Sequence, residues 1–242
     1  MSILHAIILS LIQGISEFLP ISSTGHLHLF QYFLGITPSL TFDIFLNTAS
    51  LLSVLFFFRN QTKYFFNNLL YIIVGTIPAV LVGLLFKSQL ETIFANNSLL
   101  WSQFLFSGIA LFLTRYIKPK DEKMTFGKAL IIGIFQALAI IPAISRSGST
   151  IFAGLLLGLS PLAAFNFSFS LFIPASIGAL VLDIKDLVNM GALTPVFIFS
   201  FILTFLVGVV ALSYLKKVLL GRHFWLFGIY MLLLSLFCYI VL

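Results

Sequence analysis

The polar hexapeptide Ser145-Arg146-Ser147-Gly148-Ser149-Thr150 lies within residues 129–182, a stretch that is otherwise without charge. A guanidinium in the middle of a membrane costs about 3 kcal/mol or more, so Arg146 is expected to have a function. The neighbouring hydroxyls supply hydrogen-bond donors, and Gly148 lets backbone amides approach a ligand closely. The hexapeptide therefore predicts a phosphate-binding loop inside a membrane protein, with these expected contacts: Ser145, Ser147, Gly148 and Thr150.

A second polar string, Pro20-Ile21-Ser22-Ser23-Thr24-Gly25-His26, lies near the N-terminus. The two strings have similar surroundings, because several residues near the first recur 123 positions later near the second. These pairs are Gln13 with Gln136, Gly25 with Gly148, and Phe42-Asp43 with Phe165-Asn166. This weak internal repetition predicts one site made from two halves of the chain.

The composition is that of an integral membrane protein. Of the 242 residues, 60% are hydrophobic and 8% are charged, whereas soluble domains carry about 25% charged residues. The formal net charge is +6, but the basic residues lie in short loops between apolar segments. That distribution is typical of the positive-inside bias, so no nucleic-acid partner is expected. The single cysteine, Cys238, excludes an internal disulfide, and the N-terminus is expected to be mature sequence.

Six apolar segments have about the 20 residues that a membrane crossing needs. They are residues 40–58, 64–86, 98–116, 161–182, 194–215 and 223–241. Four shorter segments flank the polar strings and predict two re-entrant hairpins of half-helices: 3–17 with 25–35, and 128–141 with 148–159. The expected fold is an all-α, polytopic integral membrane protein with a single membrane domain. It is an inverted repeat of two halves, about 1–120 and 121–242, each with one re-entrant hairpin plus three transmembrane helices.

The loop charges agree with this topology. If the chain starts outside, ten of the thirteen lysines and arginines fall inside, at positions 59, 63, 115, 118, 120, 123, 128, 216, 217 and 222. The charged residues that fall outside are Lys87, Glu91, Asp183, Lys185 and Asp186. This asymmetry follows the positive-inside rule. The two hairpins then enter from opposite faces, so their tips are expected to meet near the middle of the membrane.

Arg146 and Glu17 are the charged candidates for the site. Arg146 either binds a phosphate or diphosphate through its planar fork, or pairs with Glu17 only to hold the hairpins together. Glu17 is the one acid of the first hairpin, and it is a candidate general base or ligand of a divalent cation. The alternative is a protonated, purely structural carboxyl.

Uncharged polar side chains complete the candidate set. His26 is a candidate proton donor or acceptor, and Ser23 is a candidate nucleophile that His26 would activate. The alternatives are a satisfied core histidine and hydroxyls that cap the second half-helix, although a capped helix N-terminus also attracts anions. The remaining expected substrate contacts are Gln13, Ser22, Thr24 and Gln136, where an amide that only packs between helices is the alternative.

These residues resemble the two signatures of a known family. Gln13-Gly-Ile-Ser-Glu17-Phe-Leu-Pro-Ile-Ser-Ser-Thr-Gly-His26 is similar to its first signature, an acid or Gln, three residues, Glu, then Phe-Leu-Pro-x-Ser-Ser-Thr-Gly-His. Pro142-Ala-Ile-Ser-Arg-Ser-Gly-Ser-Thr150 is similar to its second, Pro-Gly-x-Ser-Arg-Ser-Gly-x-Thr. The family is that of undecaprenyl-diphosphatases of the bacitracin-resistance type, and the likeness covers nearly the whole chain.

The resemblance implies hydrolysis of undecaprenyl diphosphate to undecaprenyl phosphate and inorganic phosphate, which recycles the lipid carrier for cell-wall synthesis and confers bacitracin resistance. It implies a divalent cation, Mg²⁺ or Ca²⁺, near Glu17, and these catalytic residues: Glu17, Ser23, His26 and Arg146. It also implies a multi-pass protein of the bacterial plasma (inner) membrane whose active site faces the outside. Four positions depart from the family pattern. Gln13 stands where many members have Glu, Ala143 replaces a Gly, Asn47 stands where His or Gln is frequent, and Pro161 stands where a basic residue is common.

A membrane transporter is the alternative function. Inverted repeats with broken helices at mid-membrane are typical of secondary transporters, so the same fold could move undecaprenyl phosphate across the bilayer as a flippase. The expected partners are the polyprenyl diphosphate and membrane lipid, and a homodimer is one option for the oligomeric state.

Overall fold

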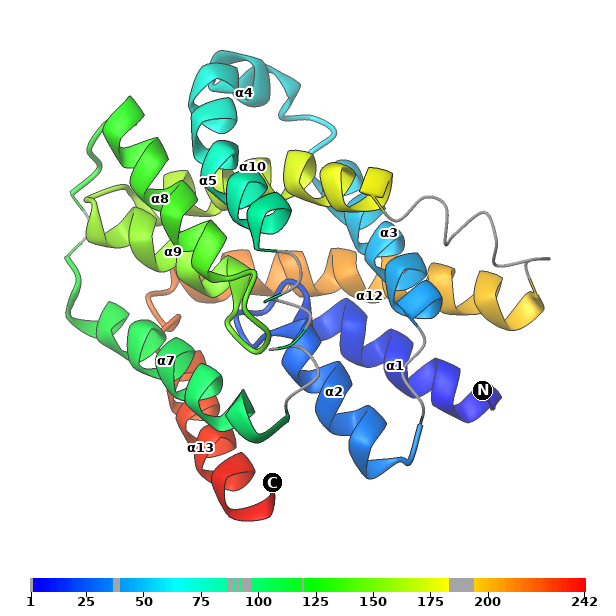
Figure 1. The fold of residues 1–242 in the computed structure, drawn as a ribbon. Coiled ribbons are helices and arrows are strands. Elements are labelled where there is room, and N and C mark those ends of the chain that lie inside the picture. Colours follow the sequence, from blue (N-terminus) through cyan, green and yellow to red (C-terminus); the bar gives the residue numbers. More distant parts are fainter. Residues whose placement is uncertain are drawn as a thin grey trace.

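A computed structural model of the chain describes residues 2–36, 40–86, 89, 92, 97–118, 120–182 and 194–242 (Figure 1). Every regular element within these ranges is a helix, as the sequence predicts. The charged residues that the predicted topology places outside, Lys87, Glu91, Asp183, Lys185 and Asp186, do not belong to the described residues.

Four short helices flank the two polar strings. The first string lies between α1 (Ile3–Ser16) and α2 (Ser23–Phe33), and the second lies between α8 (Phe126–Leu138) and α9 (Arg146–Leu156). Their ends fall within three residues of the predicted segments. Because α1 and α8 begin 123 positions apart, and α2 and α9 do too, the offset in the sequence is also an offset between helices.

The longer helices are α3 (Leu40–Phe57), α5 (Leu69–Leu85), α7 (Leu100–Leu113), α10 (Pro161–Leu182), α12 (Pro195–Leu220) and α13 (Leu226–Val241). By length and composition, α10 and α12 are long and apolar enough to cross a membrane, whereas α5 and α13 are shorter. Within the described ranges, two helices are therefore long enough to span a membrane, whereas the sequence predicts six crossings.

Two predicted segments differ from the helices that form. The segment 64–86 is divided at Asn68 into α4 (Thr62–Asn67) and α5. The backbone of Asn68 departs from helical geometry, with φ −108° and ψ 10°, and its side-chain amide donates a 2.8 Å hydrogen bond to the Tyr64 carbonyl. The segment 194–215 is too short, since α12 continues to Leu220. This continuation buries Leu219 one turn beyond Leu215 in the same core.

The two halves of the chain are interleaved. The helix α1 packs along α12, and its counterpart in the second half, α8, packs along α5 (Figure 1). The helix α3 contacts both α12 and α10, and α7 packs against α13. The helix that precedes each polar string is therefore held by a longer helix from the other half.

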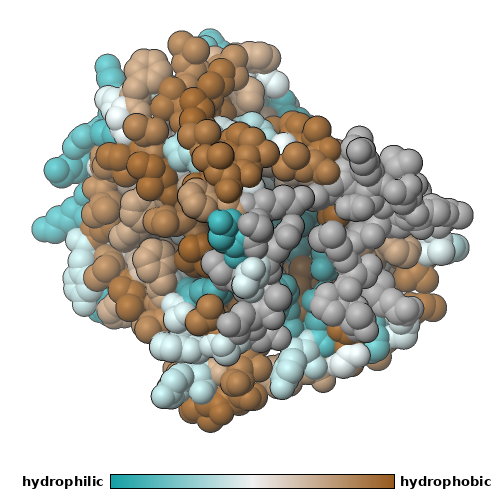
Figure 2. Space-filling model, in the orientation of Figure 1, coloured by the Kyte–Doolittle hydropathy of each residue, from teal (hydrophilic) through white to brown (hydrophobic). Residues whose placement is uncertain are grey.

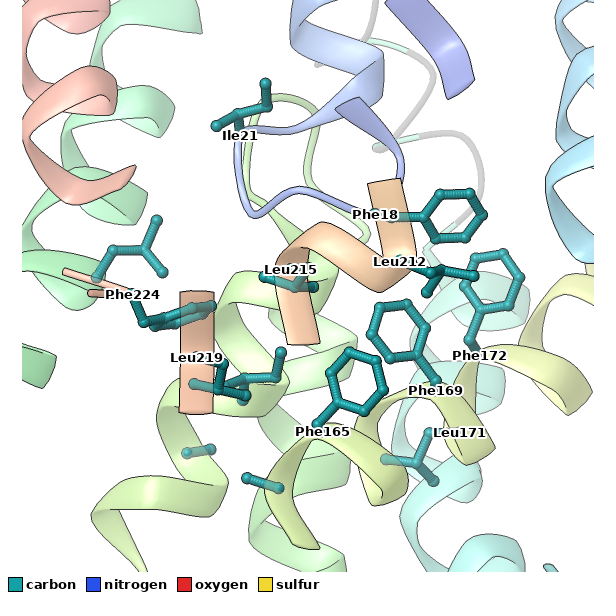
Figure 3. Close-up of a cluster of buried hydrophobic side chains, with 14 of the residues drawn as sticks. Phe18, Ile21, Phe165, Phe169, Leu171, Phe172, Leu212, Leu215, Leu219 and Phe224 are labelled. Atoms are coloured by element: carbon teal, nitrogen blue, oxygen red, sulfur yellow. The ribbon is translucent and has the colours of Figure 1, made fainter. Parts of the chain in front are cut away.

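A phenylalanine-rich core fixes the end of α1 to α10. Phe18, which directly follows Glu17, is fully buried, and its ring centroid lies 6.0 Å from that of Phe169 and 6.1 Å from that of Phe172. Aromatic pairs at such distances contribute about 0.5–1.5 kcal/mol each beyond the buried area. Figure 3 shows further members of this cluster: Phe165, Leu212 and Leu215.

Large apolar side chains cover much of the outer surface (Figure 2). Leu70 on α5, Val210 on α12 and Ile240 on α13 are 65%, 68% and 73% exposed. The largest apolar patch of a soluble monomer typically measures about 300–600 Å², whereas here exposed apolar residues recur along most helices. These surfaces suit contact with lipid, as expected for a membrane protein.

Glycines allow two pairs of helices to approach closely. A Cβ on Gly133 of α8 would lie 2.3 Å from the carbonyl oxygen of Gly75 on α5. A Cβ on Gly228 of α13 would lie 2.4 Å from the backbone nitrogen of Phe112 on α7. Any side chain at either position would clash with the backbone of the neighbouring helix. Small residues at such contacts are typical of helix packing in membranes.

Candidate active site

The tips of the two polar strings touch each other. A Cβ on Gly25 would lie 2.9 Å from the Ala143 Cβ of the second string, and a Cβ on Gly148 would lie 3.2 Å from the Pro20 Cβ of the first. Both glycines also belong to similar helix caps, because the Ser22 hydroxyl accepts from the Gly25 amide at 3.3 Å and the Ser145 hydroxyl accepts from the Gly148 amide at 3.1 Å. The structure thus brings together the two strings that the sequence assigns to one site.

Each tip contains a residue other than glycine in the left-handed region of the backbone. Ser22 has φ 69° and Ala143 has φ 57°. Such a conformation costs a residue with a Cβ roughly 1–3 kcal/mol, and glycine adopts it without strain. Ala143 is the position at which the family signature has glycine, so the backbone explains that preference.

A hydrogen-bonded chain of charged and polar groups crosses from one tip to the other. The Arg146 guanidinium at the start of α9 forms an ion pair with Oε1 of Glu17 at the end of α1. The Ser23 hydroxyl donates to Glu17 Oε2 at 2.5 Å, and Nε2 of Gln13 donates to the same oxygen at 3.1 Å. Both oxygens of the carboxylate therefore have partners, as a buried charge requires.

Helix α10 positions Arg146. The guanidinium carbon lies 3.8 Å from the ring centroid of Phe172, a cation–π contact, and Nη1 lies 3.5 Å from the Ser176 hydroxyl. The sequence offered no signal for these residues, because Phe172 is one of 29 phenylalanines and Ser176 belongs to an apolar segment. Their role follows only from the packing of α10 against α9.

A cavity of about 530 Å³ opens beside this chain of groups. Its polar end is formed by Glu17, Ser23 and Arg146, which are joined by hydrogen bonds, and Ser22, Thr24, Gln136 and Ser145 also line the cavity. The rest of the wall is mostly apolar, from α5 and α10: Ala79, Val80, Leu84, Pro174, Ala179 and Leu182. The volume lies within the range of about 300–1,000 Å³ that small-molecule sites occupy. The cavity suits an amphiphile with an anionic head and an apolar tail.

His26 lies beside this cavity rather than in its lining. Its Nδ1 lies 2.8 Å from the Ser22 carbonyl oxygen, which can only accept, so Nδ1 carries the hydrogen. In the neutral ring Nε2 then accepts from the Tyr230 hydroxyl at 2.6 Å, and the two rings stack with centroids 5.7 Å apart. The hydroxyl of Ser23 donates to Glu17 instead of His26. Among the described residues, Glu17 is therefore the better-placed proton acceptor for Ser23.

Four other predicted site residues also lie outside the lining of the cavity: Gln13, Ser147, Gly148 and Thr150. Gln13 acts through Glu17, and its Nε2 also donates to Asn47 Oδ1 at 2.7 Å. The Thr150 hydroxyl lies 2.8 Å from the Arg146 carbonyl oxygen and 2.6 Å from the Ser168 hydroxyl of α10. Gln13 and Thr150 thus contact the residues of the tips without lining the cavity.

Among the described residues, no three His, Cys, Asp or Glu side chains cluster as the ligands of a metal ion. Glu17 is the carboxylate at the cavity. Hard divalent cations are commonly held by one or two carboxylates together with the phosphates of a substrate. The donor set thus fits a cation that arrives with, or is completed by, a phosphorylated ligand.

Comparison with known proteins agrees with this geometry. The family model described as "Bacitracin resistance protein BacA" matches residues 6–237. Similar proteins include relatives that are named undecaprenyl-diphosphatase. The one from Thermosipho africanus is 35% identical over 98% of this chain and 100% of its own length. Those from Methanosphaera stadtmanae and Carboxydothermus hydrogenoformans are both 38% identical, over 95% and 97% of this chain and 94% and 98% of their own lengths.

The family match extends over both tips and all the residues that line the cavity, which come from α1 to α10. The identity extends over nearly full length on both sides of each comparison. By these two measures, and with both signatures meeting at one cavity, the chain belongs to the bacitracin resistance protein BacA family.

Proposed function

We propose that this protein hydrolyses undecaprenyl diphosphate to undecaprenyl phosphate and inorganic phosphate, and so recycles the lipid carrier of cell-wall synthesis and confers bacitracin resistance. The observation that carries the proposal is the chain from Arg146 through Glu17 to Ser23 at the polar end of an otherwise apolar cavity. A prenyl diphosphate has the matching division into a charged head and a long apolar tail. The names of the relatives support a phosphatase and do not favour the flippase alternative.

Binding begins with an exchange of partners on Arg146. In the free protein the guanidinium is paired with Glu17 and held by Phe172 and Ser176. The diphosphate takes the place of the carboxylate on the planar fork, where two parallel N–H bonds to phosphate oxygens can form. The site is partly closed to water, which strengthens these bonds and the stabilisation of charge in the transition state.

The same exchange releases Glu17 to act on Ser23. The hydroxyl oxygen of Ser23 attacks the terminal phosphorus and passes its proton to Glu17, to which it is already hydrogen-bonded. The new Oγ–P bond forms as the bond from that phosphorus to the bridging oxygen breaks, and undecaprenyl phosphate leaves with both electrons of that bond. The leaving undecaprenyl phosphate takes that proton from Glu17, which becomes a carboxylate again. Water then attacks the phosphorus of the phosphoserine and passes a proton to Glu17, and the Oγ–P bond breaks as Ser23 Oγ takes the proton back and inorganic phosphate leaves.

A divalent cation is part of the proposal. Glu17 would hold it together with the oxygens of the diphosphate, and when bound it would neutralise negative charge and polarise the terminal phosphoryl group. Gln13 contributes a neutral amide beside Glu17 where many members of the family have a second carboxylate. The cation would therefore depend strongly on the substrate for its ligands.

The proposed membrane arrangement is an inverted repeat with two re-entrant hairpins. It is supported by the common offset of 123 positions between helix starts. It is also supported by the packing of each half against the other, with α1 on α12 and α8 on α5. Irregular backbone at membrane depth is tolerated where protein or a wet cavity covers it, and both tips adjoin such a cavity. The loop charges support a site that opens to the outer side of a bacterial plasma membrane.

The proposed function is tested by phosphate release. The purified full-length protein, in detergent with Mg²⁺ or Ca²⁺, is expected to release inorganic phosphate from undecaprenyl diphosphate. A parallel experiment with sealed vesicles measures movement of undecaprenyl phosphate across the bilayer. Lipid movement without any phosphate release by the folded protein would refute the phosphatase and support the transporter.

Tyr230→Phe tests the position of His26. The variant keeps the stacked ring and removes the hydroxyl that pairs with His26 Nε2. We expect the free energy of unfolding to fall by about 1–3 kcal/mol, because a buried acceptor loses its donor. We expect kcat to change less than about tenfold, because the pair lies outside the cavity lining and its loss leaves the Glu17–Ser23 bond intact. Thermal unfolding and phosphate release measure the two effects, and a large loss of kcat in a stable variant would show that His26 acts in the chemistry.

A further inference from the structure

Ser176 of α10 lies at the boundary between the polar and apolar parts of the cavity. Of the described α10 residues that line the cavity, it is the one with a polar side chain. Its Oγ lies 3.5 Å from Arg146 Nη1, and the apolar wall continues beyond it on the same helix, at Ala179 and Leu182. Ser176 is only partly buried, so a ligand in the cavity can reach it.

The Ser176 hydroxyl is not bonded in the way that helical hydroxyls commonly are. A serine or threonine within a helix often donates to the carbonyl oxygen four residues earlier, and Ser10, Thr76 and Ser213 do so here at 2.6, 2.7 and 3.0 Å. Within the described part of the chain, the hydroxyl of Ser176 has only the contact with Arg146 Nη1, in which it accepts. Its own hydrogen is therefore available to a ligand.

The contact with Arg146 favours an anionic acceptor for this hydrogen. At 3.5 Å the bond is longer than the 2.7–3.2 Å of ordinary N–H···O bonds, so it holds the Ser176 hydroxyl only weakly. A hydroxyl that accepts from a cation is polarised, which makes it a better donor. Phosphate oxygens can accept both from this hydroxyl and from the neighbouring guanidinium.

The order of the contacts indicates which phosphoryl group reaches Ser176. Ser23 is bonded to Glu17, Glu17 is paired with Nη2 of Arg146, and Nη1 of the same guanidinium contacts Ser176. Ser23 and Ser176 thus stand at opposite ends of one chain of contacts. Attack by Ser23 requires the terminal phosphorus at its end. The phosphoryl group that carries the prenyl chain then falls toward Ser176, where the apolar wall of α10 begins.

We propose that Ser176 binds the phosphoryl group that carries the prenyl chain, with its hydroxyl donating to an oxygen of that group beside Arg146. This phosphoryl group leaves as undecaprenyl phosphate, so the same hydrogen bond stabilises the negative charge that develops on it in the transition state. The inference rests on the proposed function, because it takes the ligand to be a prenyl diphosphate and Ser23 to be the nucleophile.

The probe is farnesyl phosphate, which has a prenyl chain and one phosphoryl group but no anhydride bond to hydrolyse. It is titrated against the purified full-length protein in detergent. Ser176→Ala is expected to raise its Kd about tenfold, the loss of one hydrogen bond to a charged group. The Kd of farnesol, which lacks the phosphoryl group, is expected to stay the same. Ser170→Ala is the matched control and should change neither Kd, because Ser170 is a buried serine of α10 outside the cavity lining.

Two further comparisons separate a direct bond from an effect on the fold or on Arg146. Ser176→Thr keeps the hydroxyl, whereas Ser176→Val has a methyl group in its place and a similar shape, so only the valine variant should bind weakly. This pair also provides the test should Ser176→Ala not fold. Arg146→Lys removes the guanidinium that Ser176 contacts but keeps the charge. In that background Ser176→Ala should still raise Kd severalfold, whereas a residue that only positions Arg146 would have no further effect.

The inference is overturned by an unchanged Kd for farnesyl phosphate in Ser176→Ala, by equal affinities of the threonine and valine variants, or by no further loss in the Arg146→Lys background. These outcomes differ from those of the hydrolysis assay. A wild-type protein that releases no phosphate from undecaprenyl diphosphate, but needs Ser176 to bind farnesyl phosphate, would preserve the binding role and refute the proposed hydrolysis. Phosphate release by the wild type with an unchanged Kd in Ser176→Ala would refute the binding role alone.

Discussion

Replacing Arg146 by alanine is expected to lower kcat/KM for undecaprenyl diphosphate by about 10³-fold or more, since an arginine that stabilises a transferring phosphoryl group contributes about 10³–10⁵ to the rate. The guanidinium stands at the junction of the two tips and faces the polar end of the cavity. Steady-state phosphate release measures the effect. Near-normal turnover in Arg146→Ala would refute the mechanism proposed above.

The matched variants separate catalysis from stability. Arg146→Ala leaves the Glu17 carboxylate without its cation, and a broken buried ion pair destabilises by about 3–5 kcal/mol. The double variant Arg146→Met with Glu17→Gln removes both charges and is expected to recover most of that stability but none of the activity. Arg146→Lys keeps the charge but not the planar fork, so it should fall between wild type and alanine.

Ser23→Ala is expected to lower kcat by about 10³-fold or more, because loss of the attacking group in a covalent mechanism removes most of the rate enhancement. Glu17 would keep its bonds to Arg146 and Gln13, so the fold should be preserved. Rapid-quench experiments with substrate labelled in the terminal phosphate should detect a phosphoserine in the wild type and none in Ser23→Ala.

Thr24→Ala is the control for this experiment, because Thr24 is the adjacent hydroxyl in the cavity wall. Its effect on kcat should be smaller than about tenfold, as for a residue with one contact to the substrate. If Ser23→Ala kept a turnover as high as that of Thr24→Ala, the nucleophile would be a water molecule activated by Glu17.

The helices that surround the site were predictable because their boundaries have local causes. Pro20 and Pro142 stop α1 and α8, and serine caps at Ser22 and Ser145 start α2 and α9. These signals act over a few residues, so they can be identified in the sequence. The division of the segment 64–86 was missed because a search for apolar runs does not detect the non-helical backbone at Asn68.

The amino-acid sequence by itself determined the membrane composition, the two polar strings, their common offset, and Arg146 and Glu17 as the charged pair between them. Only the tertiary structure decided which groups meet. It paired Ser23 with Glu17 rather than with His26. It gave Gln13 hydrogen-bond partners, whereas the amide of Gln136 has none among the described residues. The reason is physical: caps and helix ends depend on near neighbours in the chain, whereas these partnerships depend on how helices distant in sequence pack around the tips.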